Sequence, residues 1–203
     1  MKTSSTLLVV ALGSFFSAAA FAQTAAQIEE RDVRAQQRIE QGLQSGQLTT
    51  REASRLERGE ARIDRMEANA MKDGNLSDAE RARITHTQDA ESRAIYREKH
   101  DAQTANPNSP SSRRMQADVQ RNINQQQRIA NGARSGQLTT REEGRLDRGE
   151  SRIDRREARA GADGHVGRHE QRGIQHADNR ESRHIYRERH NHHHYYQRDQ
   201  GRG

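Results

Sequence analysis

The sequence predicts an all-α protein made of two tandem three-helix units. Residues 36–100 and 126–190 share more than half of their positions at a constant offset and without gaps, so the chain carries one unit twice. Within each copy proline is absent, while Arg, Glu, Gln and Ala, which favour helices, are frequent. A short Gly-x-Leu-Thr-x-x-Glu motif occurs once in each copy and returns 28 residues later in a related form, as Gly-x-Leu-Ser-x-x-Glu in the first copy and Gly-x-Val-Gly-x-x-Glu in the second, so each copy divides into three helical segments.

The first 22 residues are typical of a secretory signal peptide. Lys2 supplies the positive charge, residues 7–16 form an apolar stretch too short to span a bilayer, and Ala20 and Ala22 flank Phe21 in a small-x-small cleavage site. We therefore expect cleavage after Ala22, a periplasmic or secreted mature chain, and no transmembrane segment once the signal is removed. The absence of cysteine excludes disulfides, a thiolate metal site and lipid anchoring of the new N-terminus.

The recurring motif predicts the joints between helices. Its glycine is suited to the left-handed position that ends one helix, its Thr or Ser to the N-cap of the next, and its Glu to closing a capping box. The four motifs begin at Gly46, Gly74, Gly136 and Gly164. They predict helices over residues 27–43, 49–72, 77–99, 117–133, 139–161 and 168–190. Gly167 replaces the capping residue in the last motif, so we expect that joint to be the weakest.

These helices define the expected organisation of the mature chain. Repeat unit 1 covers residues 23–100 and repeat unit 2 covers residues 118–190. Between them, residues 101–117 contain both prolines together with Asn and Ser, which predicts a flexible linker. Residues 191–203 predict a disordered, histidine-rich tail.

The middle helix of each copy is expected to carry a thin apolar stripe between a basic and an acidic flank. Leu56, Ile63 and Met66 follow helical spacing, with arginines one position earlier and acidic residues one position later. In a parallel pair, each Arg at heptad position g would face a Glu at position e of the partner. The alternative is a solvated helix that leans on its own neighbours. The residues predicted to pair helices, between copies or between molecules, are Arg55, Leu56, Glu60, Arg62, Ile63, Glu67, Arg145, Leu146, Glu150, Arg152, Ile153 and Glu157.

Histidine is concentrated toward the C-terminus, which suggests a metal site. Imidazole is the commonest ligand for Zn, Cu and Ni in proteins without thiols. The candidate metal-ligating residues are His165, His169, His184, His190, His192, His193 and His194. A polar tail of no particular function is the alternative, because a short histidine-rich tract is only a compositional signal.

The joint motif also resembles the second half of an EF-hand calcium loop, in which Gly, an apolar residue and Glu occupy the same relative positions. The first half of the loop does not match. Asp73 and Asp163 are the carboxylates at suitable positions, so each joint offers too few oxygen ligands, and the loop from Asp73 to Glu80 is the best of the four. Capping explains the motif without an ion.

Other functional classes find little support in the composition. We expect no enzymatic activity, because no Gly-x-Ser-x-Gly, His-Glu-x-x-His, phosphate-binding loop or cysteine nucleophile occurs. The chain has 35 Lys and Arg against 29 Asp and Glu, and only 3% aromatic residues. This balance, the lack of stacking aromatics and the export signal argue against nucleic-acid binding. Anionic envelope components remain candidate partners for the arginine flanks.

At residues 36–39, 45–49 and 93–100 the chain resembles a group of short secreted proteobacterial proteins known as hypothetical exported proteins. The resemblance covers both repeats and implies a periplasmic or secreted location, but no activity. The leading hypothesis is therefore a non-enzymatic exported protein that binds a divalent transition metal through its C-terminal histidines. The alternatives are an interaction protein that uses charge-striped helices for self-association or envelope binding, and a degenerate EF-hand-like calcium binder.

Overall fold

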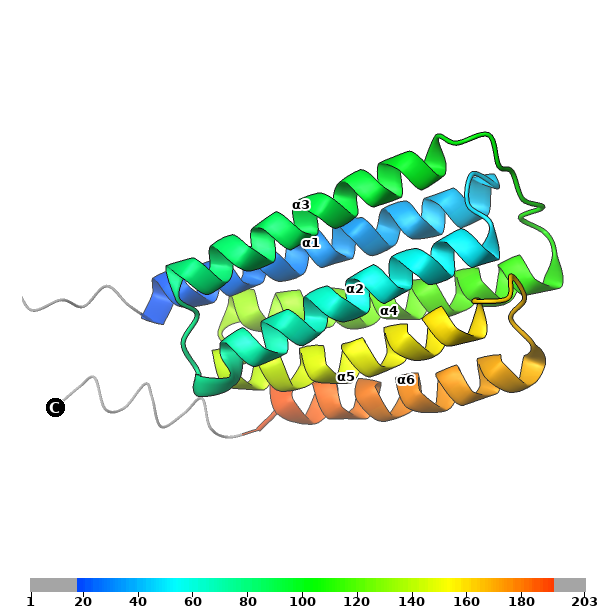
Figure 1. Ribbon diagram of the computed structural model, residues 1–203. Coiled ribbons are helices and arrows are strands. Elements are labelled where there is room, and N and C mark those ends of the chain that lie inside the picture. The colour runs from blue at the N-terminus through cyan, green and yellow to red at the C-terminus, as the bar shows by residue number, and fades with distance from the viewer. Residues whose placement is uncertain (1–17, 192–203) are drawn as a thin grey trace, which may run out of the picture.

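The computed structural model describes residues 18–191, with side chains from residue 25 onward, and this part of the chain is all helical, as predicted (Figure 1). No strand occurs within it. The elements are α1 Ala18–Ser45, α2 Thr50–Ala70, the 3₁₀ helix η1 Met71–Asp73, α3 Asp78–Lys99, α4 Pro110–Ser135, α5 Thr140–Ala160 and α6 Arg168–Arg189.

The glycine joints have the predicted conformation. The four motif glycines have left-handed backbones, with φ of 76° at Gly46, 87° at Gly74, 71° at Gly136 and 93° at Gly164. Capping boxes begin α2, α3 and α5 at Thr49, Ser77 and Thr139. At α6, Gly167 has no side chain to cap the helix, and only its backbone N–H bonds Glu170, at 2.8 Å. The last joint therefore keeps the hydrogen bond to the glutamate but lacks the one that a capping side chain accepts in the other three.

The prediction of a flexible linker over 101–117 is wrong for residues 110–117, which form the first two turns of α4. Ser109 caps α4, and Pro110 takes the first helical position, where its missing N–H leaves no bond unmade. The shorter connection is docked on the first joint, because the backbone N–H of Ala105 donates to the carbonyl of Gly46 at 2.9 Å. Pro110 starts a helix here and does not mark a loop.

At the N-terminus, α1 begins at Ala18 and so includes the last residues of the predicted signal peptide. Residues 1–17 and 192–203, which hold the rest of the signal peptide and most of the predicted tail, lie outside the described residues. None of the helices in the described part of the chain combines the length and apolar character that a bilayer crossing requires.

The two copies pack against each other as one bundle (Figure 1). α2 packs along α5 and α1 along α4, while α3 lies on α1 and α2, and α6 lies on α4 and α5. Equivalent residues of the copies meet at the centre, where Ser151 Oγ donates to the carbonyl of Ala61, 90 residues away, at 2.8 Å. Arg51 donates to the carbonyl of Asp163 and Arg141 to that of Asp73, each at 2.8 Å. These matched contacts indicate an approximate two-fold axis between α2 and α5.

The helices of the central pair run antiparallel. Gly144, near the start of α5, approaches Met71 beyond the end of α2, and Gly161, beyond the end of α5, approaches Ser54 near the start of α2. A parallel pairing of Arg55 and Arg62 with glutamates of the other copy is therefore not how the copies meet. Small residues make the close approach possible, since a Cβ on Gly144 would lie 2.8 Å from the Cβ of Met71.

Candidate metal centre

The acidic flank of each middle helix faces the interior of the bundle. On α2, Glu57 and Glu60 are fully buried and Asp64 and Glu67 are at most 3% exposed. The equivalent residues of α5, equally buried, are Asp147, Glu150, Asp154 and Glu157. The neighbouring arginines point to solvent instead. The flank that the sequence suggested as one side of a solvated helix is therefore the lining of the core.

The layer formed by α1 and α4 presents polar side chains to these carboxylates. The buried polar side chains of α1 are Glu29, Asp32 and Gln36, and those of α4 include Asp118, Asn122, Gln125 and Gln126. Within residues 25–191, the charged side chains that are buried are all acidic, and more than half of the acidic residues belong to this set. The centre of the bundle thus holds a concentration of carboxyl groups without basic partners, between apolar clusters that include Leu48, Met71 and Ile129.

Two groups of three carboxylates come close enough to share a cation. In core centre A, Glu57, Asp154 and Glu157 each place an oxygen within 4.8 Å of the others. In core centre B, the same is true of Glu29, Glu67 and Asp147. The two-fold axis relates most of these ligands, since Glu57 is the equivalent of Asp147 and Glu157 is the equivalent of Glu67. The bundle therefore contains two related centres, each with ligands from α2 and α5.

Buried amide side chains complete core centre A. Asn122 donates from Nδ2 to Glu157 at 2.8 Å and to Asp154 at 3.2 Å, and Gln36 donates from Nε2 to Glu57 at 3.0 Å. Both amides are fully buried, and their carbonyl oxygens have no hydrogen-bond partner among the described residues. Buried polar atoms are normally satisfied. Each amide faces the carboxylates with its NH2 group, so its oxygen would reach an ion at core centre A only after the amide turned over.

Core centre B has a similar second set of polar groups. Gln88 of α3 donates from Nε2 to Asp32 at 2.8 Å and to Glu67 at 3.3 Å. Gln126 of α4, the equivalent of Gln36, is 2% exposed, and neither polar atom of its amide is hydrogen-bonded among the described residues. Gln36 of α1 thus bonds a ligand of core centre A, whereas its counterpart Gln126 of α4 makes no such hydrogen bond to core centre B.

Burial raises the pKa of these carboxyl groups. Loss of solvation is the main cause throughout, and it raises the pKa of Asp32 and of Glu57 to about 7 and that of Asp118 to about 8. Burial, followed by repulsion from Asp32, also raises the pKa of Glu60 and of Asp64 well above the usual range. Both carboxylate oxygens of Glu60 lack a hydrogen-bond donor. The negative charges of this core need either protons or cations.

The ligand set determines which cations suit the core. It consists of carboxylate and amide oxygens, without sulfur or imidazole, and such oxygens favour Ca²⁺, Mg²⁺ and Mn²⁺ over Cu²⁺, Ni²⁺ or Zn²⁺. Helix bundles commonly build metal sites in this way, from inward-facing carboxylates on adjacent helices. Cation binding would displace protons from groups that would otherwise retain them at neutral pH.

A cavity of about 310 Å³ between α1, α2 and α3 provides access to the core. Asp32, Glu60 and Gln88 line it, together with Glu91. Gly59 makes room for the side chain of Glu91, because a Cβ on Gly59 would lie 2.1 Å from a carboxylate oxygen of Glu91. Burial raises the pKa of Glu91 to about 7. Arg31, Arg34 and Arg38 also line this cavity, so its wall carries both carboxyl and guanidinium groups next to Asp32 and Gln88.

The predicted histidine ligands lie apart from these centres. His165 and His169 are exposed at the start of α6, and His190 stacks on Tyr186 with ring centroids 4.1 Å apart. His184 lies between Glu181 at 2.9 Å and Glu188 at 3.2 Å, and its pKa is raised mainly by the hydrogen bond to Glu181. No group of three potential ligands in the described residues includes a histidine. The candidates His192, His193 and His194 lie outside the described residues.

The predicted pairing residues divide into three environments. Leu56, Ile63 and their counterparts in α5 are buried, as an apolar stripe requires. The arginines of both sets, Arg55, Arg62, Arg145 and Arg152, are exposed, and the glutamates Glu60, Glu67, Glu150 and Glu157 are buried. The arginines and glutamates therefore do not form the proposed ion pairs between the two copies.

The EF-hand-like joints use their polar groups for capping. Asp73 accepts the backbone N–H of Asn75 at 2.9 Å, and Asp163 accepts that of His165 at 2.8 Å. Glu80 accepts the N–H of Ser77 at 3.0 Å. Hydrogen bonds within the joint thus account for the residues that matched the calcium loop.

The sequence pattern does not predict the core centres, because it assigns the acidic flank either to ion pairs between helices or to solvent. The available signal was the helical spacing of Glu57, Glu60, Asp64 and Glu67, which matches that of the apolar stripe and recurs in copy two. Charged residues are seldom buried without partners, so the pattern was interpreted as an exposed surface.

No family model, curated protein or solved structure matches the chain.

Proposed function

We propose that this protein is a non-enzymatic, exported cation-binding protein that holds hard divalent cations in its bundle core. The main support is that core centres A and B combine clustered carboxylates with fully buried amide oxygens that lack a partner. Full burial of several unpaired carboxylates is strongly unfavourable unless protons or cations neutralise them. At neutral pH a cation supplies this neutralisation without requiring every group to stay protonated.

Calcium is the cation we expect first, with manganese as the second candidate. Calcium accepts six to eight oxygen ligands in flexible geometry, which suits side chains contributed by four helices. Core centre A offers Glu57, Asp154 and Glu157, with the amides of Gln36 and Asn122 next to them. Magnesium demands closer octahedral geometry and retains its water, so a centre of fully buried carboxylates suits it less well.

Titration calorimetry of the full mature chain with Ca²⁺, Mn²⁺ and Zn²⁺ tests the proposal. We expect Ca²⁺ or Mn²⁺ to bind at a fixed stoichiometry, and the double variant Glu57→Gln/Glu157→Gln to lose at least one ion. Asp78→Asn is the matched control, because Asp78 is exposed and pairs only with Arg81 on the surface. Equal binding by the double variant and the control would exclude core centre A as a cation site.

Transition-metal binding by the histidine-rich end stays a separate prediction. Its candidate ligands are His165, His169, His184, His190 and the three histidines at 192–194. Truncation after Arg189 in the same calorimetry separates the two hypotheses, because it removes the tail and leaves the core intact. Loss of stoichiometric Cu²⁺, Ni²⁺ or Zn²⁺ binding would support the histidines, and loss of Ca²⁺ binding would contradict the core assignment.

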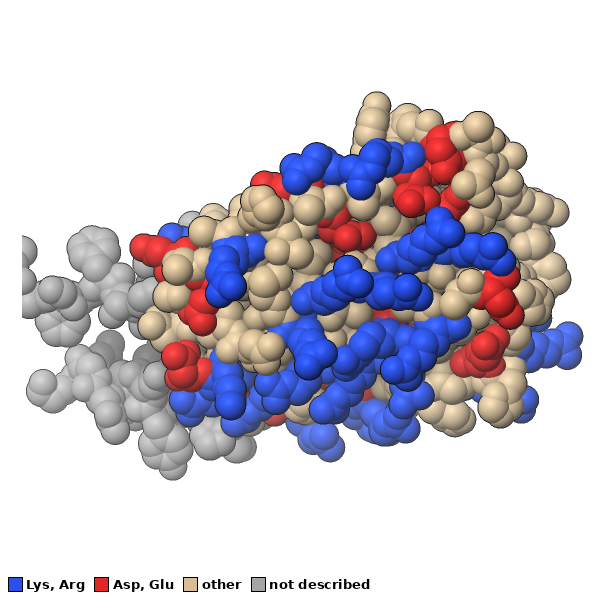
Figure 2. Space-filling model, viewed as in Figure 1, with Lys and Arg blue, Asp and Glu red and all other residues tan. Residues whose placement is uncertain are grey.

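A second candidate function is binding to an anionic envelope surface through the face formed by α2 and α5. Burial of the acidic flanks leaves the arginines of both helices outside, and Figure 2 shows rows of basic side chains across this face. The exposed arginines are Arg51, Arg55, Arg58, Arg62 and Arg65 of α2 and Arg141, Arg145, Arg148, Arg152, Arg156 and Arg159 of α5. Among the described residues their one salt bridge joins Arg145 to Glu188 at 4.0 Å.

Sedimentation with vesicles tests this surface. We expect binding to vesicles that contain anionic lipid, no binding to neutral vesicles, and release at high salt, because exposed charges are screened within about 10 Å at 0.1 M salt. The variant Arg58→Glu/Arg148→Glu should weaken binding. A change of equal size in Arg113→Glu, outside this face, would contradict the assignment.

A further inference from the structure

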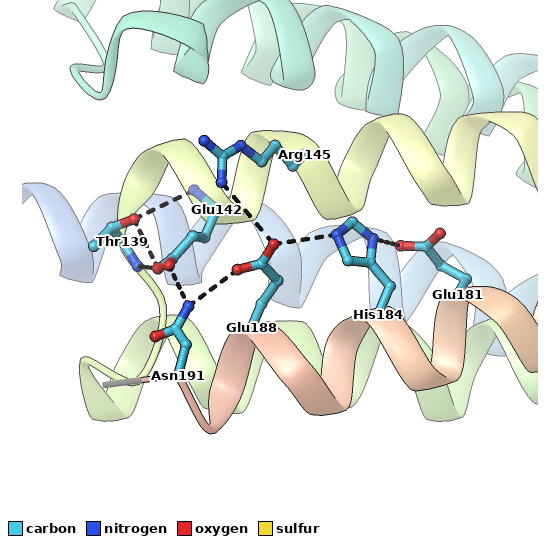
Figure 3. Close-up of polar contacts among 7 residues, drawn as sticks. All are labelled: Thr139, Glu142, Arg145, Glu181, His184, Glu188 and Asn191. Atoms are coloured by element: carbon cyan, nitrogen blue, oxygen red, sulfur yellow. Dashed lines mark hydrogen bonds and ion pairs between the residues drawn. The ribbon is translucent and has the colours of Figure 1, made fainter. Parts of the chain in front are cut away.

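A network in copy two joins the start of α5 to the end of α6 (Figure 3). The amide of Asn191 donates to Glu142 at 2.6 Å and to Glu188 at 3.1 Å. Glu142 also belongs to the capping box of α5, where it accepts the N–H of Thr139 at 2.8 Å. In this network the Asn191 amide bridges two carboxylates that would otherwise repel each other.

Glu188 has further partners in copy two. The ring of His184 lies 3.2 Å from Glu188, and the guanidinium of Arg145 lies 4.0 Å from it. Figure 3 shows that these two side chains and Asn191 surround the Glu188 carboxylate. Its charge is therefore offset by an amide, a histidine and an arginine.

The equivalent positions in copy one, here named the rim site, hold three carboxylates. Glu52, Glu98 and Asp101 each place an oxygen within 4.8 Å of the others. Asp101 stands where copy two has Asn191, and Ala94 stands where it has His184. Glu98 has no salt bridge among the described residues. Copy one thus has one more negative charge and two fewer donors at the same place.

One buried atom distinguishes the rim site from an ordinary cluster of surface acids. Glu52 is 1% exposed, and its Oε1 has no hydrogen-bond partner, although its other oxygen accepts the N–H of Thr49 at 2.8 Å. In copy two, the corresponding Oε1 of Glu142 accepts the Asn191 amide. Asp101 is held in place by the N–H of Gln103, which donates to its Oδ1 at 2.8 Å. The amide donor that serves Oε1 of Glu142 is therefore lacking at Glu52.

We infer that the rim site of copy one binds a calcium ion at the position that the Asn191 amide fills in copy two. Calcium fits the all-oxygen ligand set, and the exposure of Asp101 lets water complete its coordination. Three carboxylates and solvent correspond to the weaker class of calcium sites, with dissociation constants on the order of 10⁻⁴ to 10⁻³ M. The site is separate from core centres A and B and does not depend on them.

Calcium titration of the full mature chain, followed by amide NMR, tests the inference. We expect saturable shifts at Glu98 and Asp101 and none at Glu188 and Asn191. Asp101→Asn should weaken calcium binding at the rim by at least about tenfold while keeping the fold, because copy two already carries Asn at this position. Equal shifts at both ends, or a rim response unchanged in Asp101→Asn, would overturn the inference.

The reciprocal variant sharpens the test. Asn191→Asp with His184→Ala gives copy two the residues of copy one, so calcium should now shift Glu188 as well. If it folds, as shown by its circular dichroism, and shows no new response, the inference fails; if it does not fold, Asp101→Asn alone decides. The variant Glu57→Gln/Glu157→Gln should keep the rim shifts, which separates failure of the rim site from failure of the core centres.

Discussion

The two copies present four matching buried carboxylates from α2 and α5 but surround them differently, and α5 adds Glu143 where α2 has Ala53. Copy one adds Glu29 and Asp32 from α1, where copy two has Val119 and Asn122 on α4. Copy two in turn adds Asp118 from α4 and Asp178 from α6, where copy one has Ile28 and Gln88. At the rim, copy one has Asp101 where copy two has an amide. The middle helices therefore define a common acidic core. The residues around it determine how much of its negative charge protons or cations must neutralise.

The largest expected effect concerns this neutralisation. The folded protein raises the pKa of its core carboxyls, so it holds more protons than the unfolded chain, and its stability is highest below their ordinary pKa and is lost as the pH rises through the raised values. With pKa values of about 7 for Asp32 and Glu57 and about 8 for Glu143, the loss falls between about pH 4 and pH 8.

Chemical denaturation with a chelator present measures this loss. A group whose pKa is raised to about 7 contributes about 3 kcal/mol if it is a Glu and about 4 kcal/mol if it is an Asp, so the total loss should reach several kcal/mol by about pH 8. Saturating calcium should reduce it, because the cation replaces the protons. A free energy of unfolding that rises with pH in the chelator would contradict the description of the core in both copies.

The next effect comes from making copy one resemble copy two at a single position. Asp32→Asn places the residue of copy two beside core centre B, and its amide oxygen can still accept the hydrogen bond from Gln88. Without calcium at about pH 8, we expect the variant to be more stable than wild type by about 4 kcal/mol, and the difference to vanish near pH 4. Urea denaturation at both pH values measures it.

The opposite exchange is the control for this position. Asn122→Asp adds a carboxyl to core centre A and removes the donor to Glu157, so it should destabilise the calcium-free protein at about pH 8. Stability changes of the same sign in the two variants would show that the charge of the core does not determine its stability.

A smaller effect is expected where the copies meet. Gly144→Leu places a side chain against Met71, whose Cβ would lie 2.8 Å from the new Cβ, and we expect a loss of about 1 to 3 kcal/mol. Thermal unfolding measures the change. Gly173→Ala is the control, because nothing lies within 4 Å of a Cβ there and alanine favours the helix by about 0.5 to 1 kcal/mol. A neutral Gly144→Leu would contradict the close packing of α2 on α5.

The smallest effect compares two joints. Ser77 caps α3 and closes a box with Glu80, whereas Gly167 at the same place in copy two has no side chain. Ser77→Ala should lower the free energy of unfolding by about 1 kcal/mol, and Gly167→Ser should raise it by a few tenths. Denaturation curves of the two variants measure both values, and a stabilising Ser77→Ala would refute the capping role.

The sequence was sufficient for the secondary structure but not for the placement of its charges. The motif at Gly46 and its three repeats predicted every joint, because left-handed glycines and capping boxes are local features. The start of α4 at Pro110 was missed, since proline also begins helices. The inward orientation of Glu57 and Asp154 depends on how the copies pack. An acidic flank next to an apolar stripe can face either the solvent or the core.

Proton release on calcium binding tests the central claim most directly. In weakly buffered solution at about pH 6.5, adding calcium to the folded full chain should release protons in proportion to the ions bound, because cations replace protons on carboxyls with raised pKa. The Glu57→Gln/Glu157→Gln variant should release fewer. Calcium binding without any release of protons, or identical release by the two proteins, would contradict the account of core centres A and B.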